Sequence, residues 1–172
     1  MIHMNTSNLF LILATLATGL IAGLFYAWSC SVIPGIGRLS DLEYMSAMQA
    51  MNRAILNPVF FASFMGTVFL LPIAAFVNRT SPGSAPFILL VAASALYIFG
   101  AFAVTMFGNV PLNNALDAFS IPSATPAEIS KQRALFEAPW NKLHQVRTVA
   151  SIAAFVLTIL ACLAKPGNIP GK

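Results

Sequence analysis

Four long stretches of the sequence contain no Asp, Glu, Lys or Arg: residues 1–37, 54–78, 80–116 and 148–164. Of the 172 residues, 58% are hydrophobic and 8% are charged, whereas about 25% of the residues of an ordinary soluble domain are charged. A helix needs about 20 consecutive apolar residues to cross the hydrocarbon core of a membrane. We therefore predict a single all-α domain, residues 1–172, built as a four-transmembrane-helix bundle with two short polar helical connections on one membrane face. The expected spans are approximately residues 8–32, 54–77, 86–108 and 141–164.

The charge distribution favours an integral, multi-pass protein of the inner or plasma membrane, in contact with the lipid bilayer. The first stretch lacks the basic region of a cleavable signal peptide, so we expect it to remain as a helix. Arg79 and Lys165 directly follow the second and fourth spans, and by the positive-inside rule they favour cytoplasmic termini. No run of Lys or Arg indicates a nucleic-acid partner. Cys30 and Cys162 lack metal-ligand spacing and are expected in the apolar core.

Polar side chains collect at the helix ends that alternating topology places on one membrane side. These are the end of the first span, the start of the second, the end of the third and the start of the fourth. Three sets have helical spacing, so that each set presents one face: Gln49, Asn52 and Arg53; Asn109 and Asn113; and Trp140, His144 and Arg147. Polar groups at membrane depth are costly and are usually partnered or functional. The pattern predicts a shared polar pocket at this membrane face.

Structural interpretations of the same residues stay open. Trp28 is typical of an anchor at the membrane interface. Asn109 is typical of a helix cap if Pro111 ends the third span and begins a short helix. For Arg53 and Arg147 the structural interpretation is an ion pair or a contact to lipid phosphates. The convergence of these residues on one end of a small bundle favours the pocket.

Four blocks of the sequence resemble, in order and spacing, the signature blocks of the anthrone oxygenase-like family of small four-helix membrane proteins. The blocks are "FYAWSCSVIPGIGRL", "MQAMNRAILNPVFF", "VTMFGNVPLNNAL" and "WNKLHQVRTVAS". The resemblance covers essentially the whole chain and implies a four-helix membrane fold. Some fungal members oxidise an anthrone to an anthraquinone, which implies an oxygenase activity. The matching positions are Asn52, Arg53, Asn109, Asn113, Trp140, His144 and Arg147, and many relatives have Asn where this chain has His144.

An anthrone loses a proton to give an electron-rich anion that reacts with O2 directly, so the expected reaction needs a base and donors for an oxyanion. His144 is expected to act as the general base, because imidazole titrates near neutral pH. Arg147 and Arg53 are expected to stabilise the enolate, and Asn109 and Asn113 to orient the oxygen atom.

The remaining expected site residues would bind an aromatic or quinone-like small molecule. Trp140, Phe107 and Tyr26 are expected to stack on its rings. Trp28, Gln49 and Asn52 complete the expected binding site. A homo-oligomer is compatible with this interpretation.

Two alternatives remain open at this stage. In the first, His144 binds a transition metal, with Asp117 and Glu137 as further ligands, or haem, with His144 as its single axial ligand. No cofactor is expected, and zinc and copper sites normally combine several ligands. In the second, the protein is not an enzyme. It would then be a small-molecule, quinone or lipid-binding membrane protein, or an accessory subunit of a larger partner.

Overall fold

The computed structural model describes residues 5–79 and 83–164, which form helices and no strands. The first long helix, Thr6–Ile36, consists of α1 (Thr6–Ala27), the π-helical segment η1 (Trp28–Val32) and α2 (Ile33–Ile36). It is followed by α3 (Asp41–Ala54) and α4 (Pro58–Val77). The next long helix, Ala85–Ala118, consists of α5 (Ala85–Ala95), the π-helical segments η2 (Leu96–Ala103) and η3 (Thr105–Asn109), and α6 (Val110–Ala118). The last described elements are the 3-10 turn η4 (Ile121–Ser123) and α7 (Pro126–Leu163).

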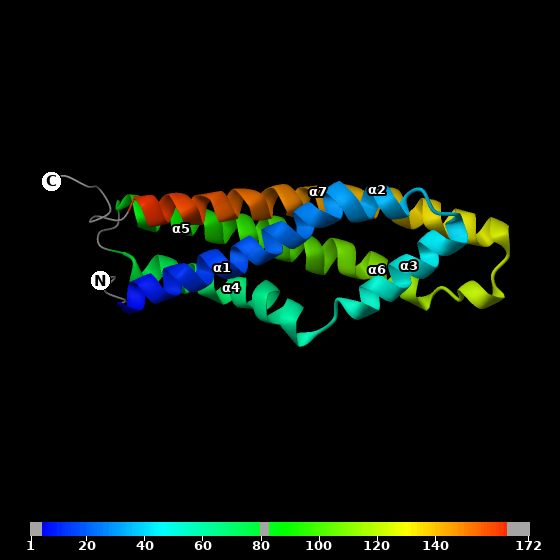
Figure 1. The fold of residues 1–172 in the computed structure, drawn as a ribbon, viewed down its shortest axis with the longest axis horizontal. Helices are drawn as coiled ribbons and strands as arrows, with labels where there is room; N and C mark the ends of the chain where they lie inside the picture. Colours follow the sequence, from blue (N-terminus) through cyan, green and yellow to red (C-terminus); the bar gives the residue numbers. More distant parts are fainter. Residues whose placement is uncertain (1–4, 80–82, 165–172) are drawn as a thin grey trace.

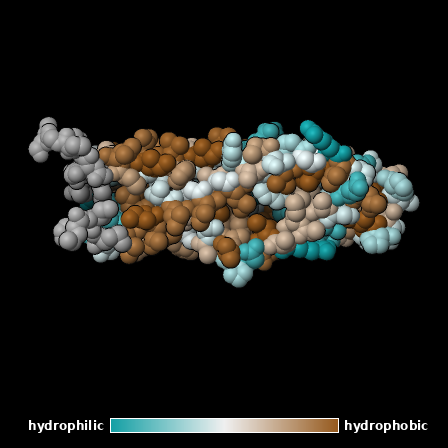
Figure 2. All heavy atoms as spheres, in the orientation of Figure 1, coloured by the Kyte–Doolittle hydropathy of each residue, from teal (hydrophilic) through white to brown (hydrophobic). Residues whose placement is uncertain are grey.

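Four of these helices are long and apolar enough to cross a membrane, which confirms the predicted all-α class. Helix α4 has 20 residues, about the length that the hydrocarbon core requires. The other three have 31, 34 and 38 residues and extend past the start of α4 in the same direction (Figure 1). Hydrophobic residues cover the half of the molecule around α4, and hydrophilic residues are frequent in the other half (Figure 2). We call this second half, which contains α3, α6 and the first turns of α7, the polar end.

Local sequence signals explain where the helices begin. Capping boxes start α3 and α7, because the side chains of Ser40 and Thr125 accept hydrogen bonds from the backbone N–H of Glu43 and Glu128 while these carboxylates accept in return. Asn57 caps α4, which has a proline at its first position. Each cap satisfies backbone N–H groups that have no partner within the helix.

The third long helix does not break at Pro111, which corrects the expectation that a new helix begins there with Asn109 as its cap. Asn109 has helical backbone angles and makes no capping hydrogen bond. The backbone N–H of Val110 donates to the carbonyl of Thr105, five residues earlier, which is the π-helical pattern. Proline lacks an N–H and its ring crowds the preceding turn. The wider π turn just before Pro111 accommodates the ring without ending the helix.

Small residues allow α7 to pack closely against its neighbours. A Cβ atom on Gly100 would lie 2.6 Å from the Cβ atom of Ala150, and one on Gly19 would lie 2.8 Å from the ring of Phe155. Gly23, the second glycine of the "GLIAG" stretch, has open space at that position. Close packing therefore depends on Gly19 and Gly100.

Arg133 of α7 connects elements of the polar end through hydrogen bonds and an ion pair. Its guanidinium donates to the carbonyl oxygens of Gly37 and Leu39 at 3.0 and 2.9 Å and forms an ion pair with Asp41 at 3.0 Å. The same group lies over the ring of Tyr44, 4.3 Å from its centre. Burial of Tyr44 raises the pKa of its phenol. One side chain of α7 thus holds the connection between the first long helix and α3.

Two further expectations concern single residues. Cys30 is exposed, contrary to its expected place in the core, because the side chain lies on the outer face of η1; Cys162 is half-buried. Both described ends, Asn5 and Ala164, lie at the end of the bundle opposite the polar end (Figure 1). Lys165 lies outside the described residues, and the cytoplasmic location of the termini stays a prediction.

Candidate functional site

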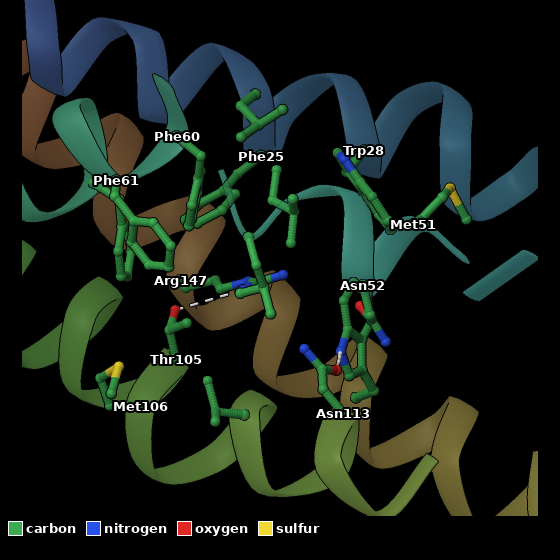
Figure 3. A pocket seen from close by; sticks show the side chains of 16 residues that line it. Phe25, Trp28, Met51, Asn52, Phe60, Phe61, Thr105, Met106, Asn113 and Arg147 are labelled. Atoms are coloured by element: carbon green, nitrogen blue, oxygen red, sulfur yellow. Dashed lines mark hydrogen bonds between the residues drawn. The ribbon is translucent and has the colours of Figure 1, made fainter. Parts of the chain in front are cut away.

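A cavity lies where the hydrophobic half of the molecule, around α4, meets the polar end (Figure 3). The space in and around it that is free of protein atoms amounts to about 670 Å³, which includes space open to the surroundings. Five elements supply its walls: the α1–η1 boundary, the end of α3, the start of α4, the stretch from η3 into α6, and α7. Aromatic rings dominate the lining, and they belong to Phe25, Trp28, Phe60, Phe61, Phe64 and Trp140. Such a cavity suits a flat apolar ligand.

Arg147 is the charged residue of this cavity, and its side chain is only 8% exposed. Its Nε and Nη2 lie 3.2 and 3.0 Å from Nδ1 of His144, and its Nη1 lies 3.5 Å from the hydroxyl of Thr105. The guanidinium carbon is 4.4 Å from the ring centre of Phe25 and 5.1 Å from that of Trp140. A guanidinium has more N–H groups than these contacts use. N–H groups of Arg147 therefore remain for a ligand.

No acidic side chain of the described residues forms an ion pair with Arg147. The ion pairs in residues 5–79 and 83–164 belong to Arg53, with Asp117, and to Arg133, with Asp41 and Glu137. A buried charge is expensive unless a partner compensates it. The cavity next to Arg147 is therefore electrostatically suited to an anion.

The Nε2 atom of His144 faces three oxygen atoms and carries the proton. It lies 3.2 Å from the carbonyl oxygen of Phe25, 3.0 Å from Oγ of Ser29 and 3.3 Å from Oγ1 of Thr148. The Ser29 hydroxyl donates its own proton to the carbonyl of Phe25, and the Thr148 hydroxyl donates to the carbonyl of His144. All three oxygen atoms are therefore available as acceptors, and Nε2 is the donor.

The Nδ1 atom of His144 accepts from Arg147, which is always charged and can only donate. This contact assigns His144 as neutral, with its one ring lone pair directed at the guanidinium. The imidazole is fully buried and stacks on Trp140, with ring centres 5.2 Å apart and planes 4° from parallel. His144 therefore stands behind the cavity wall and orients Arg147. The role of His144 as a general base stays a prediction.

Two amides form a second polar group in the cavity. The indole Nε1 of Trp140 donates to Oδ1 of Asn113 at 2.7 Å, which fixes the orientation of the Asn113 amide. Asn52, from the end of α3, lies beside it (Figure 3). The Nδ2 atom of Asn52 is buried and has no hydrogen-bond partner among the described residues. These two amides present N–H donors to the cavity.

The structure brings some of the predicted site residues together and separates others. Arg147, Asn52, Asn113, Trp28 and Trp140 line the cavity. His144 and Asn109 lie behind its wall, where the Nδ2 atom of Asn109 donates to the carbonyl of Trp140 at 3.3 Å. Asn109 and Asn113 thus both contact Trp140, in agreement with their helical spacing.

The other four predicted residues do not reach the cavity. Tyr26 and Phe107 are 59% and 85% exposed, because they adjoin the inward-facing Phe25 and Asn109 by one and two residues on helices that turn by about 100° per residue. Arg53 is exposed and pairs with Asp117 at 2.6 Å. Gln49 donates to the carbonyl oxygens of Leu116 and Phe119 at 2.8 and 2.9 Å, which joins α3 to α6. The positions of Arg53 and Gln49 fit structural roles.

Sequence reasoning missed Phe25, Thr105 and the phenylalanines at the start of α4. These residues stand in apolar helices in which nothing distinguishes a ring in the cavity from a ring against lipid. Thr105 precedes Asn109 by four residues and therefore shares its helix face, which is the one signal that points to it.

The described residues do not assemble a metal site around His144. Asp117 and Glu137, the further ligands considered, instead pair with Arg53 and Arg133. No group of three or more His, Cys, Asp or Glu side chains suited to a metal ion occurs within residues 5–79 and 83–164. Both ring nitrogens of His144 already make hydrogen bonds, so this residue is a poor fit to haem or to a transition metal.

Fold and cavity together define a small multi-pass membrane protein with a buried cation beside an aromatic cavity. Residues 48–157 match the family model described as anthrone oxygenase, and the chain belongs to this family. The matched range includes Asn52, Asn113, Trp140, His144 and Arg147. No curated protein and no solved structure matches the chain.

Proposed function

We propose that this protein is an oxygenase that binds an anthrone-type aromatic compound as its anion, next to Arg147, and lets the anion react with O2 without a cofactor. The main support is the buried Arg147 guanidinium, which has no acidic partner among the described residues. A ligand that supplies the missing negative charge removes the cost of this buried cation. Family membership supports the same reaction class.

The proposed reaction needs few protein groups. An anthrone carries a CH2 group opposite its ketone, and transfer of one proton from this group to solvent water puts negative charge on the ketone oxygen. Arg147 stabilises this enolate, as a donor aimed at developing charge does in other enzymes. The anion adds O2 at the carbon opposite the enolate oxygen, and the peroxide takes up a proton. Loss of one water molecule then leaves the quinone, so that one anthrone and one O2 give one anthraquinone and one H2O.

Oxygen uptake tests the proposal directly. Purified protein in lipid nanodiscs is supplied with anthrone, and O2 consumption is compared with anthraquinone formation. We expect equal amounts of both, and Arg147→Met should lower the rate about 100-fold, the effect of removing one oxyanion donor. Lys142→Met is the matched control, because it removes a positive charge from an exposed position of the same helix. Equal rates in Arg147→Met and wild type would refute the role of Arg147.

We propose that His144 positions Arg147 instead of acting as the base. His144→Asn keeps a side-chain oxygen that can accept from Arg147 but removes the titratable ring, whereas His144→Leu removes the acceptor. A positioning role predicts turnover within about tenfold of wild type for His144→Asn and a pH profile of the same shape as that of wild type across the imidazole range, with a much larger loss for His144→Leu. Loss of all turnover in His144→Asn, with folding and ligand binding intact, would instead support a base.

One observation favours a second candidate function, a membrane protein that binds aromatic anions without reacting with them. The ring lone pair of His144 is held by Arg147, and a pure binding protein needs no proton acceptor. Binding of anthrone without O2 consumption above the rate in protein-free nanodiscs would identify this function.

A further inference from the structure

We propose that Asn52 and Asn113 form a second subsite, which binds an oxygen atom at the end of the ring system opposite Arg147. The preferred ligand is then an aromatic compound with oxygen functions at two opposite ends. This inference rests on the proposed function, because it takes Arg147 as the binding group for the first oxygen.

Two polar groups interrupt the apolar lining of the cavity at different places. In Figure 3, Asn52 and Asn113 lie together on one side of the Arg147 guanidinium, and Thr105 lies on its other side. The Trp140 indole contacts both groups, with its ring centre 5.1 Å from the Arg147 guanidinium carbon and its Nε1 2.7 Å from Oδ1 of Asn113. The two polar groups therefore border the same aromatic wall of the cavity.

The amides are arranged to donate. Because Oδ1 of Asn113 accepts from Trp140, the NH2 group of Asn113 is the part left for a ligand. The Nδ2 atom of Asn52 is buried and unpartnered among the described residues, and buried donors without a partner are rare because they are costly. Donors from α3 and α6 thus converge at one place, and an oxygen atom there would satisfy both. Neutral amides suit a carbonyl or hydroxyl, whereas the guanidinium end suits an oxyanion.

The reaction needs donors at this place. O2 adds to the ring carbon opposite the enolate oxygen, so with the enolate at Arg147 the new oxygen faces the amides. Hydrogen bonds from Asn52 and Asn113 stabilise the negative charge of the peroxide as it forms. The same donors bind the second carbonyl of the quinone. The amide pair therefore distinguishes the product, with oxygen at both ends, from anthrone, with oxygen at one end.

Binding measurements with two probes test the subsite without any turnover. The probes are 9,10-anthraquinone and, under anaerobic conditions, anthrone. Both tryptophans of the chain line the cavity, so ligand binding to the protein in nanodiscs is followed by quenching of their fluorescence. Asn113→Asp replaces the NH2 donor with an oxygen and leaves an acceptor for Trp140. Asn52→Leu removes the other donor without adding charge.

We expect each variant to weaken anthraquinone binding about tenfold, the effect of losing one buried partner, and Asn52→Leu, which adds no charge, to leave anthrone binding within about twofold. Asn114→Asp is the matched control, because it adds the same charge at an exposed position next to Asn113 and should change neither Kd. An equal effect of Asn52→Leu on both probes, or no effect of either variant on anthraquinone binding, would overturn the subsite and leave the proposed function intact. Failure of both probes to bind wild-type protein would overturn the proposed function, and the subsite with it.

Discussion

Replacement of Arg147 by methionine should change the ionisation of a bound anthrone more than any other property. At an effective dielectric constant of about 20 and a distance of about 4 Å, one positive charge stabilises a ligand anion by about 4 kcal/mol. This energy corresponds to about 3 pKa units, and transfer of the oxyanion from water into the cavity offsets part of it. We therefore expect wild-type protein to lower the pKa of bound anthrone by about 2 units relative to free anthrone. In Arg147→Met the pKa should equal or exceed the free value, because an apolar cavity disfavours the anion.

The assay is an anaerobic pH titration of anthrone bound to protein in nanodiscs, followed by the absorbance of the enolate. Arg147→Lys serves as the second variant, because it keeps the charge but lacks the planar fork that His144 and Thr105 hold. It should lower the ligand pKa less than wild type does. Methionine fills a similar volume without charge, and apolar replacements of buried charges are often well tolerated. Identical ligand pKa values in wild type and Arg147→Met would refute the electrostatic reasoning.

The remaining predictions concern stability. Gly100→Ala should lower the stability of the protein by about 1–3 kcal/mol in thermal unfolding, the usual cost of overpacking, because the new Cβ would lie 2.6 Å from that of Ala150; Gly23→Ala, with open space around it, should not. Hydrogen bonds from Ser40 lower the pKa of the Glu43 carboxyl below its usual value of 4.5, so its contribution to stability is fully present above pH 4.5 and is lost as the pH falls through the lower, folded-state pKa. Glu43→Gln keeps the capping hydrogen bonds and should show less loss of stability than wild type on acidification in that range.

The fold is largely readable from the sequence, because uncharged windows of sufficient length and the capping residues around α3, α4 and α7 are local signals. Parts of the site follow from similar signals: helical spacing places Asn109 and Asn113 on one face, and in the structure both contact Trp140. The sequence does not show which side chains form pairs across long distances along the chain. The sequence presents Arg53 and Arg147 alike, and only the fold shows that Asp117, 64 residues from Arg53, neutralises the first of them.

Helix register explains another part of what was missed. An apolar residue such as Phe107 carries no mark of the direction in which it points, and the π-helical segments before Pro111 shift the register in a way that no spacing rule anticipates. The donor and acceptor sides of a histidine also depend on its neighbours. His144 is a reasonable base by its intrinsic chemistry, and only the position of Arg147 shows that its lone pair is occupied.

The cavity has walls of two kinds: α7 is one continuous helix, whereas α3 and α4 are two helices joined by a turn. Arg133 and Arg147 lie on this single helix, about four turns and about 21 Å apart. The contacts of Arg133 at the polar end therefore help to fix the position of the helix that also carries Arg147 and Trp140. The opposite wall is built differently, because Asn52 belongs to α3, which joins α4 through a three-residue turn, residues 55–57. A ligand in the cavity therefore contacts Arg147 on a continuous helix and Asn52 on a short helix that ends in a turn. Asn113, the other amide, lies on the third long helix.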